Sequence, residues 1–121
     1  MTAQTDLNGS YSGSAIATGA TGTLTLAGQS PGGTTLTGSL SWSTVGGTKT
    51  ANLDGIWLAD PNDASALYFA LTGTSTNGVG TISVTGYTES VQLNVTIAWA
   101  LALPGAAHDG HSEPAVFTPT T

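Results

Sequence analysis

One short stretch of the sequence gathers side chains that could do chemistry: His108, Asp109, His111 and Glu113. Imidazole and carboxylate groups are metal ligands, and a Ser-His-Asp triad could in principle be assembled from the same stretch. The His-x-x-His spacing has low specificity, no nucleophile-elbow motif accompanies it, and a neighbouring glycine and proline are typical of an exposed loop. The sequence therefore favours a solvated polar loop at 106–114, with no metal site, no cofactor and no catalytic residues.

Three other carboxylates also have structural interpretations. Asp60 and Asp63 flank a Pro-Asn pair, where Asx side chains commonly bind the local backbone. Calcium would need more oxygen ligands than this turn supplies, so we expect a turn. Asp54 alternates with large apolar residues of the same stretch, which predicts a carboxylate on the outer face of a strand.

The charge of the chain excludes several classes of partner. Seven acidic residues stand against one lysine and no arginine, for a formal net charge of -6. Binding of phosphate backbones needs several Lys or Arg contacts, so nucleic acid and anionic membranes are disfavoured. The chain has no cysteine, which excludes a disulfide framework and any thiolate site.

The chain length of 121 residues predicts one domain over 1–121, with residues 1–6 flexible. No apolar run approaches the roughly 20 residues of a membrane-spanning helix, and the first residues lack the basic and apolar regions of an export signal. We expect a soluble chain. Its Thr- and Ser-rich composition favours a secreted over a cytoplasmic location if a signal peptide was removed.

The dominant signal is alternation of apolar and polar residues with a period of two, which is typical of half-buried antiparallel strands. It recurs in TGTLTLAG, TTLTGSLSWST, SALYFALTGT, GTISVTG and LNVTIAWAL. Short turn signals separate these stretches, among them Asn77-Gly78, which is typical of a β-hairpin. A last short strand is predicted at 115–118. The pattern predicts an all-β domain of seven or eight strands joined as an up-and-down meander.

Such a meander can close into a barrel or fold into a two-layer sandwich. A sandwich usually contains long crossovers, whereas every connection here is short enough for a hairpin. Glycines inside the strands, at 38, 55, 73 and 86, also suit closely curved strands. We therefore expect a closed antiparallel β-barrel, with the β-sandwich as the alternative.

The aromatic residues fall on the apolar face of these strands. Trp42, Trp57, Trp99 and Phe69 each share a face with the large aliphatic residues. They could fill the barrel as core, or they could line a pocket for one ligand, as in many small barrels. The sequence leaves both interpretations open.

Several short motifs of the sequence resemble motifs of the avidin–streptavidin family. Leu7-Asn8-Gly9-Ser10-Tyr11 resembles its opening L-x-G-x-W strand, Gly13-Ser14 its following G-S, and Leu36-Thr37-Gly38 its recurrent L-T-G. Thr96–Leu101 resembles its T-x-W-x-L strand, and Phe117-Thr118 stands in the place of its closing D-T-F. The chain departs from the family at that last motif, since no Asp precedes Phe117, and the W-x-G pattern of the sixth strand is absent.

The resemblance implies an eight-stranded barrel that binds a small, partly apolar, biotin-like ligand without catalysis. Together with the aromatic pattern, it gives five ligand-binding candidates: Tyr11, Ser14, Trp57, Phe69 and Trp99. The alternative is a lectin-like or structural interaction module, in which the tryptophans are core and the Thr- and Ser-rich outer faces make the contacts.

The outer face of the stretch at 93–103 is unusual, because it carries Ala98, Ala100 and Ala102 where other strands carry Thr and Ser. Small apolar residues allow another sheet to approach closely. Ile56 and Leu58 are outward apolar residues of a second strand. These five residues predict a homo-oligomer interface, with an ordinary, slightly apolar surface as the alternative.

Overall fold

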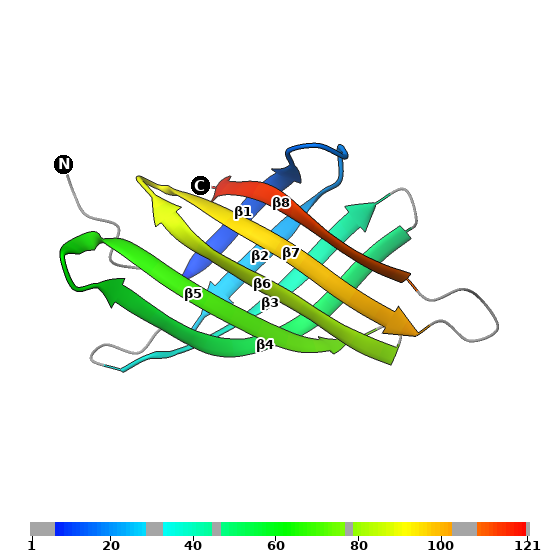
Figure 1. Cartoon of the computed structure of the whole chain (residues 1–121), viewed down its shortest axis with the longest axis horizontal. Helices are drawn as coiled ribbons and strands as arrows, with labels where there is room; N and C mark the ends of the chain where they lie inside the picture. Colours follow the sequence, from blue (N-terminus) through cyan, green and yellow to red (C-terminus); the bar gives the residue numbers. More distant parts are fainter. Residues whose placement is uncertain (1–6, 29–32, 45–46, 77–78, 103–108, 121) are drawn as a thin grey trace.

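The structure is a computed structural model, and it describes residues 7–28, 33–44, 47–76, 79–102 and 109–120. Eight antiparallel strands form a closed barrel in chain order (Figure 1). They are β1 (Gly9–Ala15), β2 (Thr21–Ala27), β3 (Thr35–Thr44), β4 (Gly47–Asp60), β5 (Asp63–Ser75), β6 (Val79–Glu89), β7 (Gln92–Ala102) and β8 (Asp109–Pro119). No helix long and apolar enough to span a membrane occurs in the described ranges.

The barrel closes because β8 returns to pair with β1, from Tyr11 opposite Pro119 to Ala15 opposite Ala115. Every other strand pairs with its neighbours in sequence. The prediction of a closed up-and-down barrel is confirmed, and the sandwich alternative is wrong. No long crossover is required, because each strand is followed by a short connection to an antiparallel neighbour.

The interior is filled by the inward residues of all eight strands. Trp42 and Phe117 are fully buried there, with ring centroids 5.6 Å apart. The core interpretation of the Trp pattern therefore holds for Trp42. Apolar burial of this kind is the main stabilising term of such a domain.

The last strand begins earlier than the sequence predicts. A polar loop was expected over 106–114, but Asp109 to Glu113 belong to β8 and pair with β7. The loop prediction is wrong there because the charged residues Asp109 and Glu113 occupy inward positions, in phase with Ala115 and Phe117. Residues 1–6 and 106–108 lie outside the described residues.

The turn predicted between β4 and β5 is confirmed. The backbone N–H of Asn62 donates to the Asp60 carboxylate at 2.8 Å, the geometry of an Asx turn. Asp54 is exposed on the outer face of β4, as its position in the alternation predicts.

Strands β4 and β5 approach each other very closely at a glycine of each strand. A Cβ atom built on Gly73 would overlap the carbonyl oxygen of Asn52 on β4 and lie 2.8 Å from its carbonyl carbon. At Gly55 the same construction overlaps the carbonyl oxygen of Ala70 on β5. Only glycine allows β4 and β5 to bend against each other in this way.

We therefore expect Gly73→Ala to destabilise the barrel by about 3 kcal/mol, since the added Cβ meets backbone atoms that cannot move without disrupting the strand pairing. Gly110→Ala is the matched control, because its nearest contact would be an ordinary 3.6 Å from the Trp99 carbonyl oxygen. The free energies of unfolding can be measured in denaturant by tryptophan fluorescence. Equal stability of the two variants would contradict the close approach.

Candidate functional site

A cavity of about 340 Å³ lies at the end of the barrel where β3 and β7 end and β4 and β8 begin. We call this cavity the cup. It is lined by Thr18, Ala20, Thr44, Lys49, Trp99, Asp109, Gly110, His111 and Glu113. The side chains of Lys49 and Glu113 are buried at its bottom. Those of His111 and Asp109, at its rim, are 45% and 33% exposed.

The alternation of side chains along β4 and β8 directs the charged groups into the cup. On β8 the residues Asp109, His111 and Glu113 occupy every second position, in phase with the buried Phe117. On β4 the alternation that buries Leu53 also turns Lys49 inward. A strand that is apolar inside at mid-barrel thus becomes polar inside at its end, where the interior meets solvent.

The first of two polar clusters in the cup is centred on Asp109. The Lys49 ammonium lies 3.0 Å from one oxygen of Asp109, and the indole N–H of Trp99 donates to the other at 3.0 Å. Lys49 also donates to the Thr44 hydroxyl at 3.3 Å and lies 5.3 Å from the centroid of the Trp99 ring. The carboxylate and the aromatic face together compensate the burial of this ammonium.

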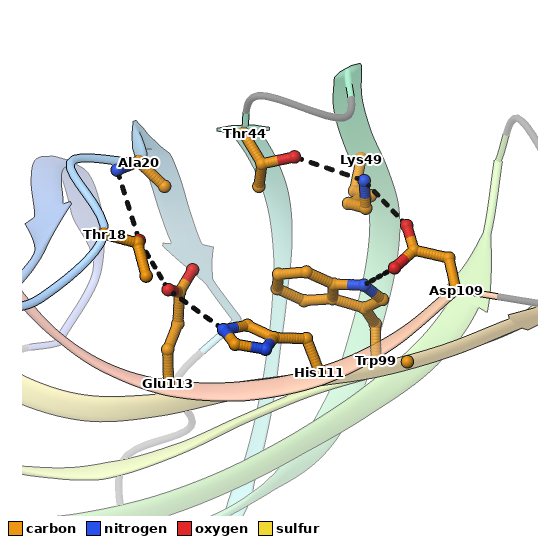
Figure 2. A pocket seen from close by; sticks show the side chains of 9 residues that line it. Thr18, Ala20, Thr44, Lys49, Trp99, Asp109, His111 and Glu113 are labelled. Atoms are coloured by element: carbon orange, nitrogen blue, oxygen red, sulfur yellow. Dashed lines mark hydrogen bonds and ion pairs between the residues drawn. The ribbon is translucent and has the colours of Figure 1, made fainter.

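The second cluster is centred on Glu113, whose side chain is only 4% exposed. The Thr18 hydroxyl donates to Oε1 at 2.6 Å and the Trp42 indole N–H donates to Oε2 at 2.8 Å. His111 Nε2 lies 3.4 Å from Oε1. The Trp99 indole lies between the two clusters and packs against His111 with ring centroids 5.2 Å apart (Figure 2).

Hydrogen bonding keeps both carboxyls ionised. Burial raises the pKa of Glu113, but the bonds from Thr18, Trp42 and His111 together outweigh it, so the pKa lies below its ordinary value. The bonds from Trp99 and Lys49 lower the pKa of Asp109 against a smaller opposing effect of burial. At neutral pH the cup therefore presents two fixed hydrogen-bond acceptors.

Trp99 is the one predicted ligand-binding residue that lines the cup among the residues described. Tyr11 and Phe69 are buried, but toward the opposite end of the barrel, where the Tyr11 hydroxyl donates to the carbonyl of Leu7 at 2.8 Å. Trp57 pairs with Phe69 across β4 and β5 and packs on the core. Its buried indole N–H has no partner in the described part of the chain.

Ser14, another predicted ligand-binding residue, does not face the barrel interior. Ser14 is exposed on the outer face of β1, because it lies an odd number of residues from the inward Tyr11. Successive side chains of a strand point to opposite faces, so these two residues cannot share one pocket.

The sequence reasoning did not select Lys49, Thr18 or Thr44. A usable signal existed for Lys49, since the inward series of Leu53 and Ala51 continues backwards to it. The same extension from Phe117 reaches Glu113 and Asp109. Thr18 lies between β1 and β2, outside any strand alternation.

A metal site is the alternative interpretation of the stretch at 108–113. No group of three or more metal-ligating side chains occurs within the described ranges. His108, one of the candidate ligands, lies outside those ranges.

Comparison with protein-family models, curated proteins and solved structures found no match to this chain. The resemblance to the avidin–streptavidin family therefore stays a prediction.

The contacts of Glu113 predict an acid-sensitive barrel. A carboxyl with a lowered pKa stabilises the fold fully above its unfolded-state value, and this contribution is lost as the pH falls through the folded-state value. We expect the free energy of unfolding to decline below about pH 5. Glu113→Gln should cost about 1–3 kcal/mol at neutral pH, because the hydrogen bonds of Thr18 and Trp42 to an ionised carboxylate become weaker bonds to a neutral amide.

The E113Q variant should also lose less stability than the wild type on acidification. Of the two carboxyls with a lowered pKa, Glu113 and Asp109, only Asp109 remains in this variant. Denaturant unfolding at a series of pH values measures both effects. Glu89→Gln, a change at an exposed carboxylate of β6, is the control and should leave the pH profile nearly unchanged. Parallel profiles for the wild type and E113Q would contradict this assignment.

Proposed function

We propose that this barrel is a non-enzymatic binding protein that holds one small, partly apolar ligand in the cup. The observation that carries the proposal is a cavity of about 340 Å³ with Trp99 between two fixed polar clusters. This volume falls within the range of small-molecule sites, which combine apolar walls with a few placed polar groups.

The lining suggests the chemistry of the ligand. A ring can stack on the Trp99 and His111 surfaces, while polar groups at its edge meet the ammonium of Lys49 and the carboxylate oxygens. The cup thus offers a donor on one side and acceptors on both. A cyclic urea, amide or polyol fits this arrangement, and a biotin-like compound is one such ligand.

Two features favour binding over catalysis. A general acid or base works best with a pKa near the working pH, whereas the pKa values of Asp109 and Glu113 are both lowered. Each carboxylate is also held by an indole N–H, which fixes its orientation. Groups held in this way are suited to recognition.

Titration with biotin tests the proposal. We expect saturable quenching of tryptophan fluorescence, with binding confirmed by calorimetry. Trp99→Leu should weaken binding about two- to tenfold, since stacking on an aromatic ring contributes roughly 0.5–1.5 kcal/mol. Trp57→Leu, at the other end of the barrel, is the matched control and should bind like the wild type.

Flat titrations with biotin and with a panel of other cyclic ureas, amides and sugars would contradict the proposal. Equal loss of binding in the two tryptophan variants would also contradict it, because a general loss of stability would then be the cause. Thermal unfolding of each variant separates that case from a local effect.

A second candidate function is a lectin-like interaction module. The observation that favours it is an outer face of β1–β3 that carries almost only hydroxyl side chains. These exposed residues are Ser10, Ser12, Ser14, Thr21, Thr23, Thr25, Thr35, Thr37, Ser39 and Ser43. Hydroxyl groups both donate and accept hydrogen bonds, as sugar hydroxyls do.

A glycan array distinguishes this candidate from the first. Glycan binding that persists in Trp99→Leu and is lost in a Ser12→Ala/Thr23→Ala variant would place recognition on the hydroxyl face. Absence of any bound glycan removes the candidate.

A further inference from the structure

The outer surface of the barrel carries an apolar patch far from the cup. The described residues include six exposed large hydrophobic side chains, and four of them form this patch: Ile56, Leu58, Tyr68 and Tyr87, each 45–51% exposed. We call these four residues the tyrosine patch. Leu58 lies opposite Tyr68, and Tyr68 opposite Tyr87, so one row crosses β4, β5 and β6.

The two tyrosines form a defined surface. Their ring centroids lie 6.4 Å apart, and the Tyr68 hydroxyl donates to Asp60 at 3.1 Å. Ile56 extends the patch by one row along β4, beside Ala70. Contiguous exposed apolar surface of this kind marks interaction sites in soluble proteins, and tyrosine is enriched where partners bind most tightly.

The strands that carry the patch also carry negative charge. Apart from Asp109 and Glu113 in the cup, the acidic residues of the described ranges all lie on β4–β6, the strands that carry the patch. They are Asp54, Asp60, Asp63 and Glu89. The pKa of the Tyr68 hydroxyl is raised by its hydrogen bond to Asp60 and by the nearby Asp63, so this side chain lies in their field.

No basic group balances this charge within the described surface. The single lysine of the sequence is Lys49, and it is buried in the cup against Asp109. His111 also lines the cup. The tyrosine patch is therefore an apolar surface on three strands that also carry four carboxylates, while the lysine of the sequence is held in the cup.

From this juxtaposition we propose that the tyrosine patch docks a cationic polypeptide segment that carries apolar side chains between its Lys or Arg residues. The apolar side chains cover Leu58 and Ile56, and the cations meet the carboxylates and the faces of the tyrosine rings. Binding proceeds through side chains, because a closed barrel offers no free strand edge for strand addition.

Charge also argues against a second copy of the chain as the occupant. Two copies related by a two-fold axis would bring the four carboxylates of each patch together, without a cation to offset them. The predicted oligomer interface combines Ile56 and Leu58 with Ala98, Ala100 and Ala102. Those alanines lie on β7, separated from β4 by β5 and β6. Self-association is therefore one outcome of the test.

The probe is a fluorescein-labelled nine-residue peptide of alternating Arg and Leu, and the readout is fluorescence anisotropy with the full chain. We expect saturable binding that weakens with added salt. Tyr68→Ser/Tyr87→Ser should weaken binding about tenfold, and Asp60→Asn/Asp63→Asn by a similar factor. Ile16→Ser is the matched control, because Ile16 is 69% exposed and lies outside the patch.

A peptide of alternating Glu and Leu should not bind. Circular dichroism and thermal unfolding check that each variant is folded, which is expected of the tyrosine and aspartate variants because their substituted side chains lie at the outer surface. Trp99→Leu should leave peptide binding unchanged, so failure of the cup as a ligand site and failure of this proposal are distinguishable.

Three results would overturn the proposal. The first is undiminished peptide binding in the Tyr68→Ser/Tyr87→Ser variant, which would mean non-specific attraction by net charge. The second is no binding of the Arg-Leu peptide at about millimolar protein. The third is a dimer of the wild type in sedimentation velocity that Tyr87→Ser dissociates, which would assign the patch to a second copy.

Discussion

The pairing of β1 with β8 is the constraint on which the rest of the structure depends. A sheet with free edges could present its residues to either side, whereas a closed sheet gives every strand one interior and one exterior face. Closure therefore turns a simple alternation along each strand into a partition of the whole sequence. It also creates two ends, and at one of them the inward positions of β4 and β8 carry charge. At this end the barrel interior meets water, so the inward side chains of β4 and β8 that form the cup are polar and not apolar.

The two tryptophans that bond to the carboxylates of the cup are best understood through their N–H groups. A buried indole N–H needs an acceptor, and Trp42 and Trp99 each find one in a carboxylate of β8. In return, those bonds help to keep Glu113 and Asp109 charged. Core packing and the polar site are thus coupled through the same side chains, and removal of either carboxylate leaves a buried donor unpaired.

The sequence predicts the fold well and the site only in part. Alternation depends on strand geometry alone, so it identifies Trp42, Phe69 and Trp99 as inward. It gives the face of a residue but not its height along the barrel axis, which depends on strand direction and register. That is why Phe69 and Trp99, alike in pattern, lie toward opposite ends. The family resemblance selects Ser14 as a ligand-binding residue, although its position in the alternation places it on the outer face. The charge of Asp109 and Glu113 favours a polar loop, although their spacing continues the inward series of β8.

Because Lys49 is buried, cleavage by trypsin can be used to measure local opening of the barrel. Trypsin cleaves after Lys and Arg, and this sequence holds one lysine and no arginine. That single susceptible bond lies within β4, its side chain 6% exposed and paired with Asp109. A protease can reach it only when the cup end of the barrel separates. The rate of tryptic cleavage after Lys49 therefore reports how often that end of the barrel opens by local unfolding.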